Sequence, residues 1–369
     1  MNNVSPLKVP VILVAGFDAD TMAIATMALG WDLPKAVAVR HDLDPTRDTL
    51  TRTVSDATGL IEKEELELDH ACASCALRED VVPTLERLAS SGQWDAIVAQ
   101  LPATASPAQV CRVSAWDPAR VPHVRISAVV AALSDTTLEG DLLGDELLCE
   151  VDLPVREDDR RGLAETACAL VEYADVVFTP GDIETDGRDL INALMRPGAR
   201  LLDSVSALDG AELTTGLHHC ETSDEWVAEV RRGPLPSPEG EAWVLDVHSD
   251  RPFHPDRLME FIAVLGGGPR RSRGCFWLPT RPHQLCIWNG AGGQLSVGTE
   301  EDWGRDESPL TRITVVGLDG GRDALAAAFE ACLLTDAEME EHGPYWEAFE
   351  DGFEPWLGPI HRGSMTEAS

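Results

Sequence analysis

The sequence predicts an α/β fold, in which a doubly wound, mostly parallel sheet is followed by a smaller α+β domain. An apolar run at residues 9–15 meets a glycine and then a helix-like stretch at 21–29. Short apolar runs alternate with amphipathic stretches as far as residue 205, a pattern typical of strands joined by crossover helices. A polar stretch at 221–240, ending in GPLPSPEG, separates this part from a second group of elements.

In the first domain, the expected strands are short apolar runs, and the expected helices are the amphipathic segments between them. The strands are expected at residues 9–15, 36–40, 96–101, 124–131, 176–178 and 200–205. After the helix at 21–29, further helices are expected at 77–89, 162–173 and 188–195. In the second of these four helices, Leu77, Val81, Leu85 and Leu88 recur at helical spacing and define one apolar face.

The second half of the chain predicts a small α+β domain and an acidic, aromatic tail. Its strands are expected at residues 242–247, 275–278, 285–288 and 313–316, and its helices at 255–265 and 322–334. We therefore divide the chain into a first domain (1–220), a linker (221–240), a second domain (241–335) and a tail (336–369). We expect the aromatic side chains of the tail to pack back on the second domain.

The composition is strongly acidic. There are 29 basic and 64 acidic residues, which give a formal net charge of −35. Such a charge disfavours contact with nucleic-acid phosphates and anionic membranes, so neither DNA nor a membrane is an expected partner. It favours basic protein partners, although an acidic bias of the whole host proteome would give the same composition. The nine cysteines are irregularly spaced and odd in number, which suits a reducing cytoplasm better than a disulfide framework.

The segment after the first strand has the context of a phosphate-binding loop but lacks its chemistry. Such a loop needs a glycine, four residues, and then Gly-Lys-Ser/Thr before a helix. Gly16 is present, but Thr21, Met22 and Ala23 stand at the last three positions. The lysine that would neutralise the β- and γ-phosphates is therefore absent, as is the hydroxyl that would hold Mg²⁺.

Two carboxylates inside this segment are further evidence against phosphate binding. Asp18 and Asp20 would repel a triphosphate, by about 1 kcal/mol or more for each close pair of charges. They would instead satisfy the start of the helix, as cap and as partner of the helix dipole. We therefore expect a tight loop at Gly16 and residues 18–22, with neither GTP nor Mg²⁺ bound.

A cysteine pair is the candidate metal site. Cys72 and Cys75 precede a helix expected to begin near residue 77, so the helix N-terminus and Arg78 should favour thiolates, the ligands that zinc prefers. His70 and His41 are candidate further ligands. A Cys-x-x-Cys pair at a helix start is also how thiol–disulfide sites are built, and two unligated thiols remain a third reading.

The chain resembles the CobW family of GTP-dependent metal-trafficking proteins along nearly its whole length. Four stretches carry the resemblance: the segment at Gly16, HACASCALREDVVPTLERLA, WDAIVAQLPATASP, and the long match from RPFHPDRLMEFI to ACLLTDAEM. The resemblance implies a P-loop GTPase-like first domain, a CobW-type C-terminal domain, and metal binding at the cysteines.

The departures from the family pattern are systematic. Ser74 replaces the middle cysteine, and Gln100 stands where the family has an acidic residue. Thr-Pro-Gly-Asp at 179–182 occupies the place of the guanine-reading Asn-Lys-x-Asp, so Asp182 alone persists. Loss of the loop, the metal-side acid and the base-reading motif together predicts a pseudo-GTPase.

The resemblance also implies a biological setting, because degenerate actinobacterial members of the family look like factors that bring a hibernation protein to ribosomes during zinc starvation. The leading hypothesis is thus a non-hydrolysing zinc-response adaptor. Its partners would be proteins, including the small ribosomal subunit and a hibernation factor. The alternatives are a GTP-dependent zinc metallochaperone and a thiol–disulfide protein.

Overall fold

A computed structural model of the protein describes residues 8–360, except for 71, 234, 236–239 and 305–306. The described chain forms two compact units. The first extends to Leu142 and resumes at Glu146–Val227; the second contains Leu143–Asp145 and the chain from Ala228 onward. No helix in the described part is both long enough and apolar enough to span a bilayer.

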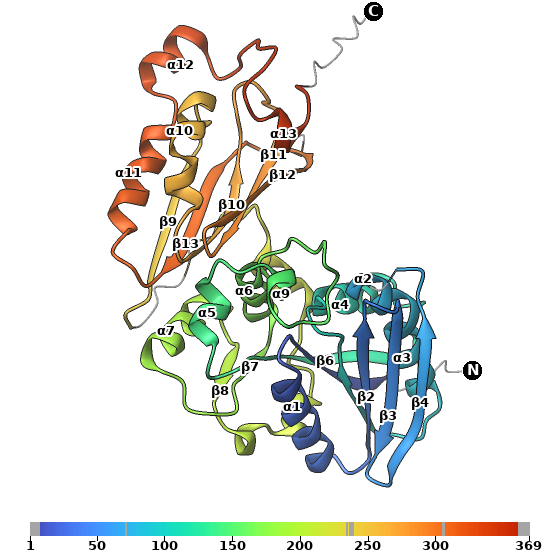
Figure 1. Ribbon diagram of the computed structural model, residues 1–369. Helices are drawn as coiled ribbons and strands as arrows, with labels where there is room; N and C mark the ends of the chain where they lie inside the picture. Colours follow the sequence, from blue (N-terminus) through green and yellow to red (C-terminus); the bar gives the residue numbers. More distant parts are fainter. Residues whose placement is uncertain (1–7, 71, 234, 236–239, 305–306, 361–369) are drawn as a thin grey trace, which may run out of the picture. The chain divides into compact units, whose positions relative to one another are not determined.

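The first unit contains an eight-stranded sheet with the order β4-β3-β2-β5-β1-β6-β7-β8 (Figure 1). Six strands are parallel: β1 (Val9–Gly16), β2 (Ala36–Asp44), β5 (Ala96–Gln100), β6 (Val124–Ala132), β7 (Val176–Phe178) and β8 (Arg200–Leu202). Each overlaps an expected strand, so the prediction of a doubly wound, mostly parallel sheet is confirmed. The strand order changes direction around β1, where α/β proteins commonly bind ligands.

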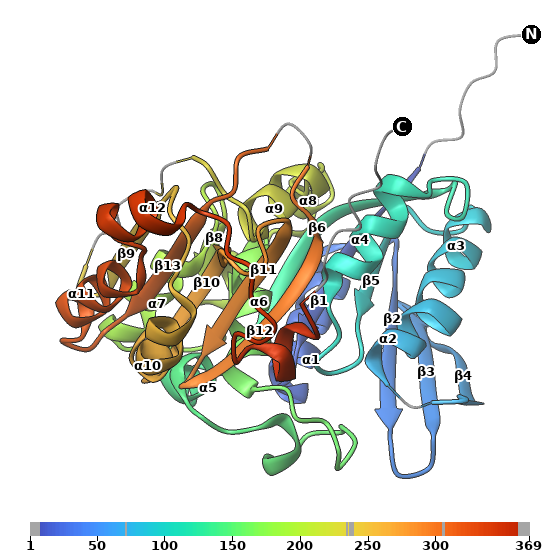
Figure 2. The same ribbon diagram turned by 90° about the horizontal axis from the view of Figure 1, so that it is seen from above.

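Two strands at one edge of this sheet were not predicted. β3 (Thr49–Asp56) and β4 (Gly59–Glu67) form an antiparallel hairpin beside β2 (Figures 1 and 2). In β3 the buried residues Leu50, Arg52 and Val54 alternate with less buried ones, and β4 is largely exposed. Because neither strand is a continuous apolar run, the criterion that found the parallel strands missed this hairpin.

Helices cover both faces of the sheet. α1 (Ala19–Asp32) buries Met22, Ala25 and Leu29 against the inner residues of β1, β5 and β6. The helices α3 (Val82–Ser90), α4 (Pro107–Trp116) and α6 (Leu163–Tyr173) contact the same strands, but none of them contributes to the core on the α1 side. The remaining helices of this unit are α2 (Ala73–Ala76), α5 (Leu138–Leu143), α7 (Thr185–Leu194), α8 (Gly210–Leu213) and α9 (Cys220–Val227).

The prediction of a linker at 221–240 is wrong for the first part of that segment. Helix α9 covers residues 220–227 and belongs to the first unit. Trp226 is 6% exposed, and its Nε1 donates a hydrogen bond to the carbonyl oxygen of Leu194 at 3.2 Å. This buried tryptophan holds the segment on the first unit. Its neighbours in the sequence are polar, so the composition did not indicate this packing. Residues 234 and 236–239 of the expected linker lie outside the described residues.

The second unit is built on a five-stranded antiparallel sheet with the order β12-β11-β10-β13-β9. Its strands are β9 (Trp243–Ser249), β10 (Arg270–Phe276), β11 (Gln284–Ala291), β12 (Gln294–Asp302) and β13 (Thr311–Gly317). The helices α10 (Pro255–Gly266) and α11 (Arg322–Cys332) supply Leu258 and Phe329 to the core that also contains Trp288. The small α+β domain is confirmed, although β12 was not predicted.

The described part of the tail packs back on this domain. It contains α12 (Asp336–His342) and α13 (Glu354–Leu357). Phe353 is fully buried in the core, and the backbone N–H of Trp346 donates to the carbonyl oxygen of Pro279 at 2.8 Å. Phe349 is 84% exposed, so the expectation holds for some of the aromatic residues and not for all. Residues 361–369 of the tail lie outside the described residues.

Candidate functional site

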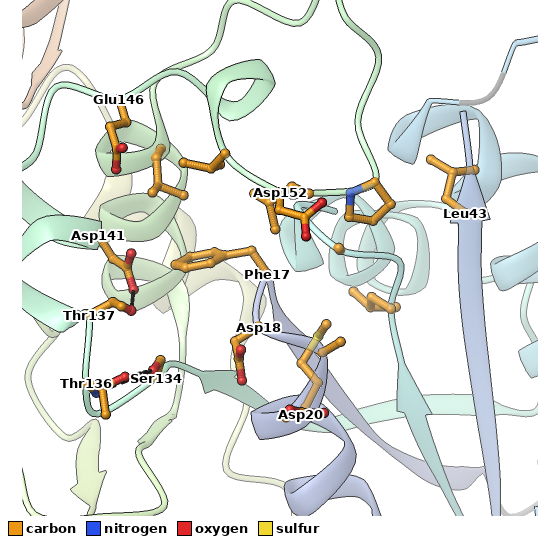
Figure 3. Close-up of a pocket in the computed structure, with 18 of the residues that line it drawn as sticks. Phe17, Asp18, Asp20, Leu43, Ser134, Thr136, Thr137, Asp141, Glu146 and Asp152 are labelled. Carbon is orange, nitrogen blue, oxygen red and sulfur yellow. Dashed lines mark hydrogen bonds between the residues drawn. The ribbon is translucent and has the colours of Figure 1, made fainter. Parts of the chain in front are cut away.

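A cavity of about 980 Å³ lies where the parallel strands end. Within the sheet, Gln100 is level with Val14 on one side and with Arg40 on the other, so the segments that follow β1, β2 and β5 meet at one edge. Seven carboxylates from these segments and from residues 139–152 line the cavity: Asp18, Asp20, Asp42, Glu139, Asp141, Glu146 and Asp152. Figure 3 labels Asp18, Asp20, Asp141, Glu146 and Asp152 among them. No lysine or arginine is among the described residues of its wall. The cavity is therefore strongly electronegative.

The start of α1 is closed by its own cap. Asp18 is the N-cap residue, and its Oδ1 accepts a hydrogen bond from the backbone N–H of Thr21 at 2.7 Å. Asp20 lies in the first turn. The expected capping is thus confirmed, and a carboxylate lies at the helix start, where a phosphate would bind. The expected loop at 18–22 is wrong in extent, because α1 begins at Ala19 and takes Thr21, Met22 and Ala23 into the helix.

The residue at the lysine position has become part of the core. Met22 is 2% exposed and packs with Ile12 and Val14. Gly16 is also explained by packing, since a Cβ there would lie 2.4 Å from the carbonyl oxygen of Ala132 and 3.1 Å from Cγ of Met22. The glycine that looked like a relic of phosphate binding is therefore needed for the contact between β1 and β6.

The structure does not bring the other candidate nucleotide-binding residues together. Asp182 is exposed on the bend after β7 and is not part of the cavity wall. Thr21 and Ala23 are also absent from that wall, so Met22 alone of the five candidate residues faces the cavity. Gln100 is 3% exposed, and its Oε1 accepts a hydrogen bond from Oγ1 of Thr26 at 3.3 Å.

The two cysteines of the candidate metal site are neighbours at a helix start. Cys72 is the N-cap of α2, and its Sγ accepts a hydrogen bond from the backbone N–H of Cys75 at 3.3 Å. Both are half-buried free thiols. The helix continues through a π-helical turn, Leu77–Val81, into α3, so it begins four residues before the expected start at 77.

The expectation that the surroundings favour a thiolate is wrong for Cys75. Its neighbour Cys72, through a hydrogen bond, raises the pKa of the Cys75 thiol, and burial raises it further. Arg78 opposes this rise, but its Nη2 lies 3.9 Å from Sγ of Cys75 and only 2.9 Å from Oε1 of Glu79. Arg78 is exposed and shared with a carboxylate, so it does not outweigh the second thiol. A metal must displace a proton from this group.

The two candidate histidines differ. His70 is exposed, and its backbone carbonyl accepts a hydrogen bond from the N–H of Cys72 at 2.9 Å. His41 is 1% exposed and lies in the cavity wall. Its Nε2 is 3.0 Å from Oδ2 of Asp80, and its Nδ1 has no hydrogen-bond partner among the described residues. Across the described chain, no three His, Cys, Asp or Glu side chains are placed to hold a metal ion.

A buried network behind His41 was not predicted from the sequence. Asp80, from the π-helical turn, accepts hydrogen bonds from His41 and from Nη1 of Arg52. Arg52 is also paired with Glu62 and Glu64 on β4. Burial alone would raise the pKa of Asp80, but His41 and Arg52 hold it below its usual value. The donor types fit zinc chemistry, because a carboxylate-oriented histidine with a free nitrogen and two thiols are typical zinc ligands.

Comparison with known proteins gives consistent similarities. Residues 243–333 match the family described as cobalamin synthesis protein cobW C-terminal domain. The protein named zinc chaperone Rv0106, from Mycobacterium tuberculosis, is 26% identical over 392 residues, which cover 95% of this chain and 94% of that protein. Zinc-regulated GTPase metalloprotein activator 1 of Dictyostelium discoideum is 23% identical over 361 residues, covering 86% of this chain and 74% of that protein. The crystal structure of Zn(II)-bound YjiA GTPase from E. coli matches with 18% identity, 89% coverage of this chain, 99% of that chain and a TM-score of 0.36.

Proposed function

We propose that this chain, whose similarities support the CobW family, takes part in zinc trafficking. The second part of the proposal is that it acts as an adaptor that does not hydrolyse GTP. The observation that carries the second part is the helix start at Asp18. The Asp18 carboxylate accepts a hydrogen bond from the N–H of Thr21, at the helix start where a phosphate would bind, and the lysine position is a buried methionine. Both the charge and the packing at this position therefore differ from those of a nucleotide-binding site.

We expect no measurable binding of GTP with Mg²⁺ by titration calorimetry. Met22→Lys is expected not to restore it, because Asp18 still caps the helix and each carboxylate near the phosphates costs about 1 kcal/mol or more. It should also destabilise the first unit, since Met22 is 2% exposed. Met27→Lys is the control for the substitution itself, because Met27 is 54% exposed on the same helix. Micromolar affinity or GTP turnover in the unmodified chain would establish the GTP-dependent metallochaperone instead.

The zinc role is assigned to Cys72 and Cys75, with His41 and His70 as candidate further ligands. A third ligand has to approach the thiol pair, since the described residues do not hold a complete set of donors. Because zinc binding releases the thiol protons and the pKa of Cys75 is raised, affinity should fall as the pH falls from above neutral.

We expect the Cys72→Ala/Cys75→Ala variant to keep its fold and to lose about one zinc per chain, the capacity of one tetrahedral site. Zinc content is measured by mass spectrometry after dialysis against a weak chelator. Cys149→Ala is the matched control, because Cys149 is another half-buried free thiol and lies outside the pair. If the double variant kept its full zinc content, the pair would not be the metal site. A Cys72–Cys75 disulfide formed at cytosolic redox potential would favour the thiol–disulfide alternative.

The adaptor part of the proposal concerns ribosomes under zinc limitation, where the chain would recruit a hibernation factor to the small subunit in the cytoplasm. Its support is the net charge of −35, which suits basic ribosomal proteins, and the nine free thiols, which suit a reducing compartment. A pull-down with the tagged chain from zinc-starved and zinc-replete cells tests it. Enrichment of ribosomal proteins only under starvation is expected, and equal recovery in both conditions would contradict it.

A further inference from the structure

A second cavity in the first unit lies between α1 and the strands β2 and β3, and we call it the α1 groove. Its volume is about 590 Å³. That volume is in the range of pockets that bind small molecules, and it is far larger than a single ion. Among the described residues, the wall of the α1 groove shares only Gln100 with the wall of the acidic cavity. The α1 groove is therefore a separate candidate site.

The helix side of the α1 groove is apolar and exposed. Trp31 and Met27 both line it, and they lie on one face of α1 because they are four residues apart. Trp31 is 79% exposed, although tryptophan is on average a highly buried residue. Ala36 and Ala38 of β2 contribute only methyl groups to the wall, so a flat ring fits against the strand. Because aromatic rings pack favourably on one another, this side of the groove suits a planar aromatic ligand.

The strand side of the groove offers a cationic group with donors to spare. Nε of Arg40 donates a hydrogen bond to Oδ2 of Asp42 at 2.8 Å, whereas its Nη1 and Nη2 have no hydrogen-bond partner in the described chain. Thr53 also lines the groove and is paired with Arg40 across the β2–β3 ladder, so the two side chains are neighbours. A guanidinium group binds a carboxylate through two parallel hydrogen bonds. This end of the groove therefore suits a carboxylate.

A cationic ligand would find less to bind. Asp56 is the only carboxylate residue among the described residues of the wall. Its Oδ1 accepts hydrogen bonds from the N–H and the hydroxyl of Thr58, at 2.8 and 2.6 Å, and its Oδ2 accepts one from Nε1 of Trp94 at 3.3 Å. These hydrogen bonds hold the pKa of Asp56 below its usual value, so the carboxylate is ionised but already supplied with donors. Arg40 is the charged group of the wall that still has hydrogen bonds to offer.

We propose that the α1 groove binds a small planar aromatic carboxylate, with its ring against Trp31 and Met27 and its carboxylate on Nη1 and Nη2 of Arg40. Zinc is not required for this binding. Arg40 and His41 are adjacent residues of β2, so their side chains lie on opposite faces of the sheet. The test therefore uses the full chain stripped of metal, at physiological salt.

The probe is 2-naphthoate, whose binding is measured by ligand-observed NMR titration. Two comparison ligands separate the contributions of charge and ring. 2-Naphthylmethylammonium has the same ring and the opposite charge, and decahydro-2-naphthoate has the same charge on a ring system that is not flat. We expect 2-naphthoate to bind with a Kd of about 1 mM or tighter, as is typical of ligands of this size. It should bind about fivefold more tightly than either comparison ligand.

Two variants test the two sides of the groove. Trp31→Ala should weaken the binding of 2-naphthoate about tenfold through the lost aromatic contact, and Arg40→Gln about fivefold through the lost charge-assisted hydrogen bonds. The matched controls are Trp116→Ala and Arg47→Gln, which should change the affinity about twofold or less. Trp116 is 68% exposed in the same unit, and Arg47 is paired through its Nε with a nearby aspartate, as Arg40 is. Neither control residue lines the groove.

Equal losses in the test and control variants would overturn the proposal, as would the absence of saturable binding of 2-naphthoate. Binding of either comparison ligand as tight as that of 2-naphthoate would also overturn it. A dimer in analytical ultracentrifugation that Trp31→Ala dissociates would assign the groove to a second copy of the chain instead. Trp31 and Arg40 are exposed, so both variants should fold, which circular dichroism verifies. If one of them unfolds, the other variant and the three ligands on the unmodified chain decide the outcome.

Discussion

Replacing Asp351 by asparagine is expected to destabilise the C-terminal domain by about 3–5 kcal/mol, as found when one partner of a buried ion pair is removed. The side chains of Arg281 and Asp351 are 1% and 0% exposed. Two hydrogen bonds join them, from Nε to Oδ2 at 2.8 Å and from Nη2 to Oδ1 at 3.0 Å. Thr280 donates a third to the same carboxylate at 2.6 Å. The variant would leave the buried guanidinium with only Glu354, whose Oε1 is 3.9 Å from Nη2, as a counter-charge.

The effect should depend on pH in a defined direction. Burial would raise the pKa of Asp351, but the hydrogen bonds from Arg281 and Thr280 lower it below its usual value. A depressed pKa in the folded state means that the carboxylate stabilises the domain above its unfolded pKa of about 3.9. That contribution is lost as the pH falls through the lower, folded value. The difference between the two proteins should therefore be full at pH 7 and should shrink in strong acid.

Urea unfolding at neutral and acid pH measures this difference. The control is Asp336→Asn, which removes the partner of Arg251 at a position whose side chain is 82% exposed. An exposed pair contributes about 0–1 kcal/mol, so the control should unfold close to the unmodified chain. A cost at Asp351 no larger than at Asp336 would show that the buried pair does not hold the tail on the domain.

The parallel sheet could be predicted because its strands are buried on both faces and appear in the sequence as continuous apolar runs. The run at 176–178 coincides with β7, and the others overlap their strands. The β3–β4 hairpin could not be found in this way, because Arg52 is among its buried residues and β4 is rich in exposed glutamates. Its arginine is buried because Asp80, Glu62 and Glu64 surround it, and these are contacts between elements.

The candidate site was predictable where the chemistry is local. Asp18 caps a helix that begins at the next residue by accepting a hydrogen bond from the N–H of Thr21, and the sequence alone indicates this contact. The pair of His41 and Asp80 joins residues 39 positions apart through a π-helical turn, and no pattern in the sequence indicates it. The raised pKa of Cys75 was missed for a similar reason. Arg78 is adjacent in the helix, but the structure shows that it is exposed and shared with Glu79.

The final prediction concerns Gly274, in the central strand β10 of the C-terminal sheet. It is paired with Trp288 on β11 and with Ile313 on β13. Its φ is +154°, and an added Cβ would lie 1.9 Å from the carbonyl oxygen of Arg312. That oxygen belongs to the backbone of the neighbouring strand, so it cannot move aside as a side chain would.

We therefore expect Gly274→Ala to cost about 3–5 kcal/mol, because a strained φ costs about 1–3 kcal/mol and an overpacked core position a similar amount. Gly298→Ala in β12 is the control, since a Cβ there meets no atom within 4 Å and its φ is not in the positive range. Urea unfolding of both variants, followed by tryptophan fluorescence, measures the difference. Trp288 is buried across from Gly274 and reports on this sheet. Equal stability of the two variants would mean that β10 and β13 can separate locally, and the close approach of Gly274 to Arg312 would then not be required for the fold.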